Sequence, residues 1–133
     1  MENNSFAPID IAVSGMRAFG KQMEVISSNV ANARTTDAGK GEPYRRLEAT
    51  FKAQQKGVGG VSLDELTIDE SDFPTILAPG NPNADENGYI SMPNVDIPIE
   101  LMNLNIATRT YQANVAVLKR YQTMVETTLE LLR

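Results

Sequence analysis

Acidic, amide and glycine residues are the candidates for chemistry in this chain, because the sequence contains neither cysteine nor histidine. The absence of these two residue types removes thiol catalysis, disulfides, histidine-based proton transfer and most zinc sites. Asn81, Asn83 and Asp85 have the spacing of the first ligands of a calcium-binding loop. Such a loop requires glycine at its sixth position and glutamate at its twelfth, where this chain has Glu86 and Met92. We therefore expect no metal site.

Two further groups of residues have the composition of a ligand-binding or catalytic site but not its arrangement. Gly39, Lys40 and Gly41 lack the other residues of a phosphate-binding loop, so a flexible turn is the better interpretation. Asp64 and Glu65 are adjacent acids, which are common in loops, and no pattern places them across a cleft as glycoside hydrolysis requires. We expect no catalytic residue and no cofactor, and we predict that the protein is not an enzyme.

The charge of the chain is unevenly distributed. The 133 residues carry a formal net charge of -5, and the middle of the chain contains the acidic cluster Asp64, Glu65, Asp69, Glu70 and Asp72. A solvated surface loop is the simplest interpretation of this cluster, and nucleic acid is not an expected partner. No apolar run approaches the roughly 20 residues of a membrane span, and no cleaved secretory signal is recognisable. We expect no bilayer-spanning segment.

Apolar residues with heptad spacing occupy both ends of the chain. A first helix is predicted from about Pro8 to Ala33, with the stripe Ile9, Ala12, Met16, Phe19, Met23, Ile26, Val30 and Ala33. A second helix is predicted after Asp96, a natural cap, with the stripe Ile97, Leu101, Leu104, Thr108, Tyr111, Val115, Leu118, Gln122, Val125, Leu129 and Leu132. Alternating steps of four and three are typical of a left-handed coiled coil. The two ends are therefore predicted to pair along these stripes.

The segment between the two helices has the patterns of strands and turns. Residues 47–53 alternate apolar and polar side chains, which predicts a half-buried strand. Further short strands are predicted around Val61, Leu63, Leu66, Ile68 and residues 89–92. We expect an α+β fold with a coiled-coil core formed by residues 1–36 and 97–133 and a small middle domain, rich in strands and loops, formed by residues 37–96.

The last predicted helix is long and poor in charge. About 36 residues at 1.5 Å each reach roughly 54 Å, whereas a compact chain of this length has a radius of gyration near 14 Å. Between Leu101 and Leu118, Arg109 is the only charged residue. A helix that is neutral all round is usually buried on several sides, which predicts neighbouring molecules. A free-standing helical hairpin with an uncharged surface is the alternative.

Polar side chains lie beside the apolar seam of both helices, namely Asn29, Asn32, Thr35, Asn103, Asn105 and Asn114. Such side chains can bond to a neighbour and fix its register, although an exposed helix surface would explain them equally well. Tyr111 and Tyr121 lie on or beside the seam, where an aromatic side chain usually packs in the core.

Four segments resemble motifs of the bacterial flagellar axial proteins, the family of rod and hook subunits. VISSNVANARTT (residues 25–36) resembles the shared amino-terminal motif, and ATRTYQANVAVLK (residues 107–119) resembles the shared carboxy-terminal motif. GEPYRR (residues 41–46) and PGNPNADENGYISMPNVD (residues 79–96) resemble segments of a rod subunit. The resemblance covers both ends and much of the middle of the chain.

This resemblance implies a structural subunit of the proximal rod, whose terminal helices polymerise into a hollow shaft that transmits torque and surrounds the protein-export channel. The implied partners are other copies of the chain, other rod proteins and the flagellar type III export apparatus. The implied location is the periplasmic rod of the basal body, after export from the cytoplasm. The motif residues implied to contact neighbouring subunits are Asn29, Asn32, Thr35, Pro93, Asn94, Arg109, Tyr111 and Asn114.

A soluble coiled-coil adaptor or chaperone is the alternative function. Such a protein would be expected to have strongly charged positions beside its seam, and these are sparse in the last predicted helix. A small hydrolase is a more distant alternative, because the chain has no histidine, no cysteine and no organised pair of acids.

Overall fold

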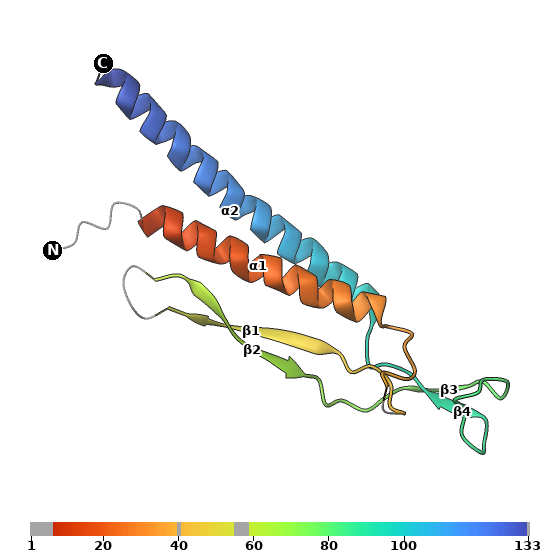
Figure 1. Cartoon of the computed structure of the whole chain (residues 1–133). Helices are drawn as coiled ribbons and strands as arrows, with labels where there is room; N and C mark the ends of the chain where they lie inside the picture. The colour runs from red at the N-terminus through yellow and green to blue at the C-terminus, as the bar shows by residue number, and fades with distance from the viewer. Residues whose placement is uncertain (1–6, 40, 55–58, 133) are drawn as a thin grey trace.

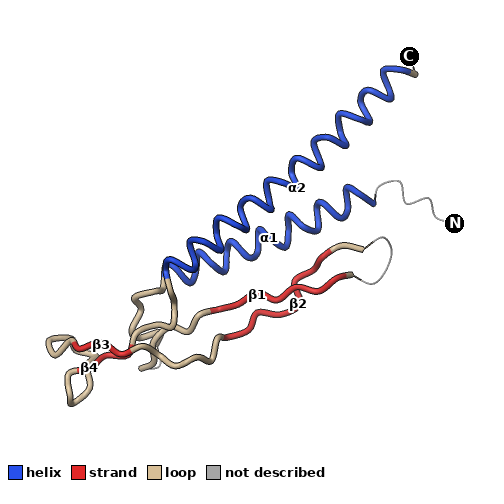
Figure 2. The backbone as a smooth tube through the Cα atoms, turned by 180° about the vertical axis from the view of Figure 1, so that it is seen from behind, coloured by secondary structure: helices blue, strands red, loops and turns tan. Residues whose placement is uncertain are grey.

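Two long helices and two small β-hairpins make up the fold. The computed structural model describes residues 7–39, 41–54 and 59–132. The elements are α1 Ala7–Ala31, β1 Leu47–Ala53, β2 Val61–Ile68, β3 Thr75–Leu77, β4 Tyr89–Ser91 and α2 Ile97–Leu131. Figures 1 and 2 show α1 between α2 on one side and the β1–β2 hairpin on the other, with the β3–β4 hairpin beyond one end of the helix pair. The predicted α+β class is confirmed.

Local sequence signals determine where both helices begin. Pro8 and Asp10 lie in the first turn of α1. Backbone N–H groups in a first turn have no acceptor within the helix, so proline costs no hydrogen bond there, and the helix dipole favours a negative charge. Asp96 caps α2, because its side chain accepts a hydrogen bond from the backbone N–H of Ile99 at 3.2 Å. Pro98 follows in the first turn of α2. The cap predicted from the sequence is therefore confirmed.

The β1–β2 hairpin contains one irregularity that its sequence pattern requires. β1 has the predicted bounds and pairs antiparallel with β2. Phe51 pairs with Leu63 and Ala49 pairs with Leu66, so the register shifts and Asp64 is an additional residue on β2. This β-bulge brings Leu63 and Leu66, which are three residues apart, to the same face of a structure with a period of two.

The β3–β4 hairpin pairs a predicted strand with one that the sequence did not predict. β4 lies within residues 89–92 as expected, whereas β3 follows Pro74 and is not among the predicted strands. Ile76 of β3 pairs with Ile90 of β4, and Ile90 is only 3% exposed. The burial of Ile90 stabilises a pair of three-residue strands that would be marginal on their own.

The core of the chain is thin and consists mainly of small side chains on α1. The buried apolar residues are Ala12, Ala18, Val25, Ile26, Ala33, Ile90 and Ala107. Small residues allow α2 to approach α1 closely. At Gly15, an added Cβ atom would lie 2.9 Å from Nδ2 of Asn114, so a larger residue would force the Asn114 side chain to shift.

Helix α2 extends beyond α1, because the two helices run antiparallel and differ in length. Gly15 lies against Asn114. Ala7 lies eight residues before Gly15, and Gln122 lies eight residues after Asn114, so these two residues are at about the same level. Residues 123–132 therefore project past the described part of α1, by about 15 Å for ten residues at 1.5 Å each. Figure 1 shows this part of α2 extending past α1. We call residues 123–132 the overhang.

We predict opposite effects for two glycine substitutions in α1. Gly20→Ala should raise the free energy of unfolding by roughly 0.5–1 kcal/mol, because alanine favours the helix and an added Cβ meets nothing within 4 Å. Gly15→Ala should lower it by about 1 kcal/mol, because its Cβ would collide with the Asn114 amide. Urea unfolding followed by circular dichroism measures both. Equal stabilisation by the two substitutions would contradict the close contact.

Candidate functional site

A cluster of polar side chains joins the end of α1 to the start of β1 and of α2. It consists of Asn29, Tyr44, Arg46, Asn94 and Glu100, and we call it the polar junction. The residues come from α1, from the connection before β1, from the segment before α2 and from the first turn of α2. The junction thus connects parts of the chain that are far apart in sequence.

Asn29 is at the centre of the polar junction and is 1% exposed. Its Nδ2 donates hydrogen bonds to the carbonyl oxygen of Leu47 at 2.9 Å and to Oε2 of Glu100 at 3.2 Å. Its Oδ1 accepts hydrogen bonds from the backbone N–H of Leu47 at 2.9 Å and from the hydroxyl of Tyr44 at 3.0 Å. Asn29 therefore uses both of its donors and both acceptor positions, and it pairs with the first residue of β1 as a neighbouring strand would.

Glu100 is a buried carboxylate, with 1% of its surface exposed. Oε1 accepts a hydrogen bond from Nε of Arg46 at 2.7 Å. Arg46 also forms ion pairs with Glu48 and, at 3.5 Å, with Asp69. Burial lowers the pKa of Arg46, but its hydrogen bonds to Glu100 and Glu48 outweigh burial and raise the pKa above the ordinary value. Two ionised groups are thus held together at the start of α2, whose dipole favours the negative charge.

Asn94 attaches the segment after β2 to the polar junction. Its Oδ1 accepts a hydrogen bond from the backbone N–H of Arg46 at 2.8 Å. Its Nδ2 donates to the carbonyl oxygen of Asp69 at 3.0 Å and to Oγ of Ser71 at 2.9 Å. Hydrogen bonds from Ser71 hold the pKa of the Asp69 carboxyl below its usual value. Every buried side-chain nitrogen and oxygen among the described residues has a hydrogen-bond partner.

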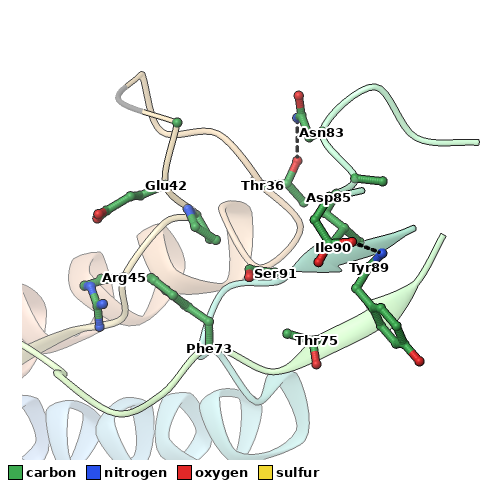
Figure 3. A pocket seen from close by; sticks show the side chains of 13 residues that line it. Thr36, Glu42, Arg45, Phe73, Thr75, Asn83, Asp85, Tyr89, Ile90 and Ser91 are labelled. Atoms are coloured by element: carbon green, nitrogen blue, oxygen red, sulfur yellow. Dashed lines mark hydrogen bonds between the residues drawn. The ribbon is translucent and has the colours of Figure 1, made fainter. Parts of the chain in front are cut away.

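A cleft of about 540 Å³ lies between the connection after α1 and the β3–β4 hairpin (Figure 3). In one wall the Arg45 guanidinium lies 4.1 Å from the centroid of the Phe73 ring. Nδ2 of Asn83 donates a hydrogen bond to Oγ1 of Thr36 at 3.2 Å and so ties the hairpin loop to the connection. Within the described ranges, no group of three or more acidic side chains could hold a metal ion. The cleft offers a contact surface rather than a constellation for catalysis.

Helix α2 has a second apolar stripe, which faces away from α1. It consists of Ile99, Met102, Ile106, Val117, Met124 and Leu131, whose exposed fractions lie between 49% and 83%. At 100° per residue, these residues lie about 120° around the helix from those that face α1. A third side of α2, about 120° from the outer stripe, is polar and includes Asn105, Gln112, Lys119, Thr123 and Glu130. We call the six apolar residues the outer stripe.

Comparison with known proteins gives consistent matches at both ends of the chain. Residues 9–38 match the family described as flagella basal body rod protein. Residues 86–131 match the family described as flagellar basal body rod FlgEFG protein C-terminal.

Individual relatives match nearly the whole chain. The flagellar basal-body rod protein FlgC of Agrobacterium fabrum is 39% identical over 127 residues, which cover 92% of this chain and 91% of the relative. FlgC of Salmonella typhimurium is 39% identical, with 92% and 93% covered. FlgC of Bacillus subtilis is 33% identical, with 96% and 97% covered. The chain belongs to the FlgC family of flagellar basal-body rod proteins.

Some of the seam residues predicted for this FlgC-family chain are buried or half-buried in the structure, and others are exposed. Ile26 is 4% exposed. Half-buried positions are Ile9, Met16, Phe19, Met23, Val30, Leu104, Tyr111, Val115 and Leu118. Leu101 differs, because it is 52% exposed while Glu100 beside it is 1% exposed. The bonds from Asn29 and Arg46 hold Glu100 inward, and this turns Leu101 toward solvent.

Three predicted seam residues, Val125, Leu129 and Leu132, lie on the overhang and are 38%, 60% and 80% exposed. They continue the side of α2 that faces α1, but α1 does not reach their level within the described residues. Their predicted contribution to assembly stays a prediction.

Several of the FlgC-family motif residues have hydrogen-bond partners within this chain. Asn32 donates to the carbonyl oxygen of Ser28 and accepts from Thr35, and Asn114 donates to the carbonyl oxygen of Thr110. Asn29 and Asn94 belong to the polar junction, Pro93 is buried, Tyr111 is half-buried and Arg109 is exposed. Their contacts with neighbouring subunits stay a prediction.

Tyr44, Arg46 and Glu100 are functional candidates that the sequence did not reveal. A buried ion pair leaves no periodic pattern in the sequence, and Arg46 and Glu100, which pair with each other, are 54 residues apart. One signal was available, because Glu100 is an acidic residue directly after the cap of a long helix, where it complements the helix dipole. In the described ranges neither helix has a stretch long and apolar enough to cross a membrane.

We predict that Arg46→Met lowers the free energy of unfolding by about 3 kcal/mol, because it leaves the buried Glu100 carboxylate without its cation. The matched control is Lys52→Met, which breaks the pair with Asp64 whose side chains are 62% and 48% exposed. That loss should be under about 1 kcal/mol. Urea unfolding of both variants gives the comparison, and similar small losses would argue against a stabilising polar junction.

Proposed function

We propose that the chain is a structural subunit of the proximal flagellar rod that polymerises through its terminal helices into a hollow axial shaft. The observation that carries this proposal is the outer stripe on α2. Full burial of a large apolar side chain contributes roughly 1.5–3 kcal/mol, and the outer stripe holds six that are about half exposed or more. A neighbouring subunit that covers the outer stripe would recover this free energy.

The division of the chain supports a mechanical function. In this proposal residues 1–36 and 97–133 form the axial core, and residues 37–96 form the outer part of the subunit. Residues 1–6 and 133 lie outside the described residues. The polar junction links the two parts by directional hydrogen bonds, which resist rotation of one part against the other better than apolar contacts do. Such a subunit can transmit torque along the shaft.

Membership of the FlgC family supports the remaining parts of the proposal. The partners are other copies of the chain and other rod proteins, and the shaft surrounds the channel through which proteins are exported. The subunit itself passes through the flagellar type III export apparatus from the cytoplasm to the periplasmic rod of the basal body. The polar side of α2 before the overhang, with Asn105, Gln112 and Lys119, suits a face toward a water-filled channel.

We predict that Val117→Asp abolishes incorporation into basal bodies and motility while the monomer keeps its helical content. Val117 belongs to the outer stripe and is 49% exposed, so the charge is tolerated until a neighbour must bury it. Gln112→Asp is the matched control, because it places the same charge on the polar side of α2. Immunoblots of purified basal bodies and swimming assays measure the outcome. Normal motility of Val117→Asp would exclude the outer stripe as an assembly surface.

We predict that assembly orders the end of α2. In the isolated chain, a glutamate-specific endopeptidase should cleave rapidly after Glu126 and Glu130, because the overhang lacks the described part of α1 beside it and its backbone hydrogen bonds are exposed to water. In basal bodies the same bonds should be protected. Mass spectrometry of limited digests measures both states. Equal protection in the monomer and in the rod would contradict ordering on assembly.

A further inference from the structure

The overhang presents a row of apolar side chains without a partner in the described part of the chain. Val125, Leu129 and Leu132 lie on the side of α2 that faces α1 at lower levels, where the same side packs Leu104 and Leu118. The side of α2 that packs on α1 thus continues beyond the described part of α1, and Figure 1 shows α2 extending past α1. A partner that covers these side chains must therefore lie on the side of α2 on which α1 packs before residue 123.

A neighbour at the same level brings no described part of α1 to the overhang. In such a copy the described part of α1 also reaches only to the level of Gln122. A copy displaced along the helix axis can bring its helix pair beside the overhang. The geometry therefore favours a staggered neighbour.

An open groove lies on the helix pair at one side of α1. It has a volume of about 560 Å³ and is lined by Val13, Met16, Gly20 and three charged residues of α1, and by Tyr111 of α2. At Gly20 an added Cβ atom would meet nothing within 4 Å, so the bottom of the groove is open to a foreign side chain. Apolar walls and a glycine at the base allow the backbone of another helix to come close.

The charges of the groove and of the overhang are complementary. Arg17, Lys21 and Glu24 line the groove, and Lys21 pairs with Glu24 at 2.7 Å. Within the described residues Arg17 has no ion pair, so the groove carries one unpaired cation. Glu126 and Glu130 on the overhang are four residues apart and are exposed. Arg17 of the groove can therefore pair with a glutamate of the overhang across one contact.

We propose that the overhang of one copy docks into the α1 groove of a second copy that is displaced along the helix axis. Leu129 lies seven residues after Gln122, and Gly20 lies thirteen residues after Ala7. Because the helices are antiparallel and Ala7 is level with Gln122, the two separations add, and Leu129 and Gly20 of one copy are about 30 Å apart along the axis. The second copy must be displaced by this distance. The contact joins two different surfaces, so it leaves both ends free and leads to an open helical assembly. This inference rests on the proposed function and specifies one contact within it.

Chemical crosslinking tests the contact directly, because the sequence contains no cysteine. Leu129→Cys and Gly20→Cys are prepared as two single variants of the full chain and are mixed at high concentration with a short bismaleimide. We expect crosslinked dimers in the mixture and few in either variant alone. Dimers of Leu129→Cys with itself would show that two overhangs pair symmetrically, and no dimer in the mixture would show that the groove is not the partner. Either result overturns the proposal.

Charge reversal tests the same contact in variants without cysteine. Arg17→Glu should raise the dissociation constant for self-association about fivefold, as expected for the loss of an exposed ion pair. Combination with Glu126→Arg and Glu130→Arg should bring it back toward that of the unchanged chain. Arg34→Glu, an exposed arginine outside the groove, is the matched control and should have no effect. Sedimentation velocity measures all variants, and equal effects of Arg17→Glu and Arg34→Glu would overturn the proposal.

Failure of this contact and failure of the proposed function give different results. If the unchanged chain enters basal bodies but the mixture shows no crosslink between Gly20→Cys and Leu129→Cys, the chain is a rod subunit whose overhang binds elsewhere. If the unchanged chain does not enter basal bodies, the proposed function itself is wrong.

Discussion

The buried hydrogen bonds of Asn29 and the ion pair of Glu100 with Arg46 are the constraint on which the rest of the structure depends. They attach the end of one helix, the beginning of a strand and the first turn of the other helix at a single point. Because the end of α1 and the start of α2 are held together at this point, it sets which residues of the two helices lie side by side along the pair. An apolar cluster of the same size would not be selective for one rotation of α2.

The thin core has the opposite character. Apart from Ile26, Val25 and Ile90, its buried apolar side chains are alanines, so the chain buries little apolar surface by itself. Most large apolar side chains of α2 are exposed instead. The fold therefore divides two tasks: polar contacts define the shape of one subunit, and apolar surface remains available for association between subunits.

What the sequence predicted and what it did not predict have a common physical explanation. Residues 47–53 and the Asp96 cap were predicted because alternation and capping act over a few residues. Leu101 was placed on the seam because heptad counting cannot detect Arg46, a partner 54 residues from Glu100 that turns the helix. The polar junction and β3 depend on such distant partners. Asn29 was recognised as a polar residue at the seam, but its four bonds became apparent only in three dimensions.

The bulge at Asp64 has a consequence for how the length of this chain can change. Removal of one residue from a strand normally moves all following side chains to the opposite face. In β2, loss of Asp64 would leave Thr50 opposite Glu65 and Phe51 opposite Leu63, so every pair across the hairpin would be kept. Leu66 and Ile68 would stay on the same face as Leu63. The hairpin beside α1 thus has one position at which it can become a residue shorter without a change of its helix-facing surface.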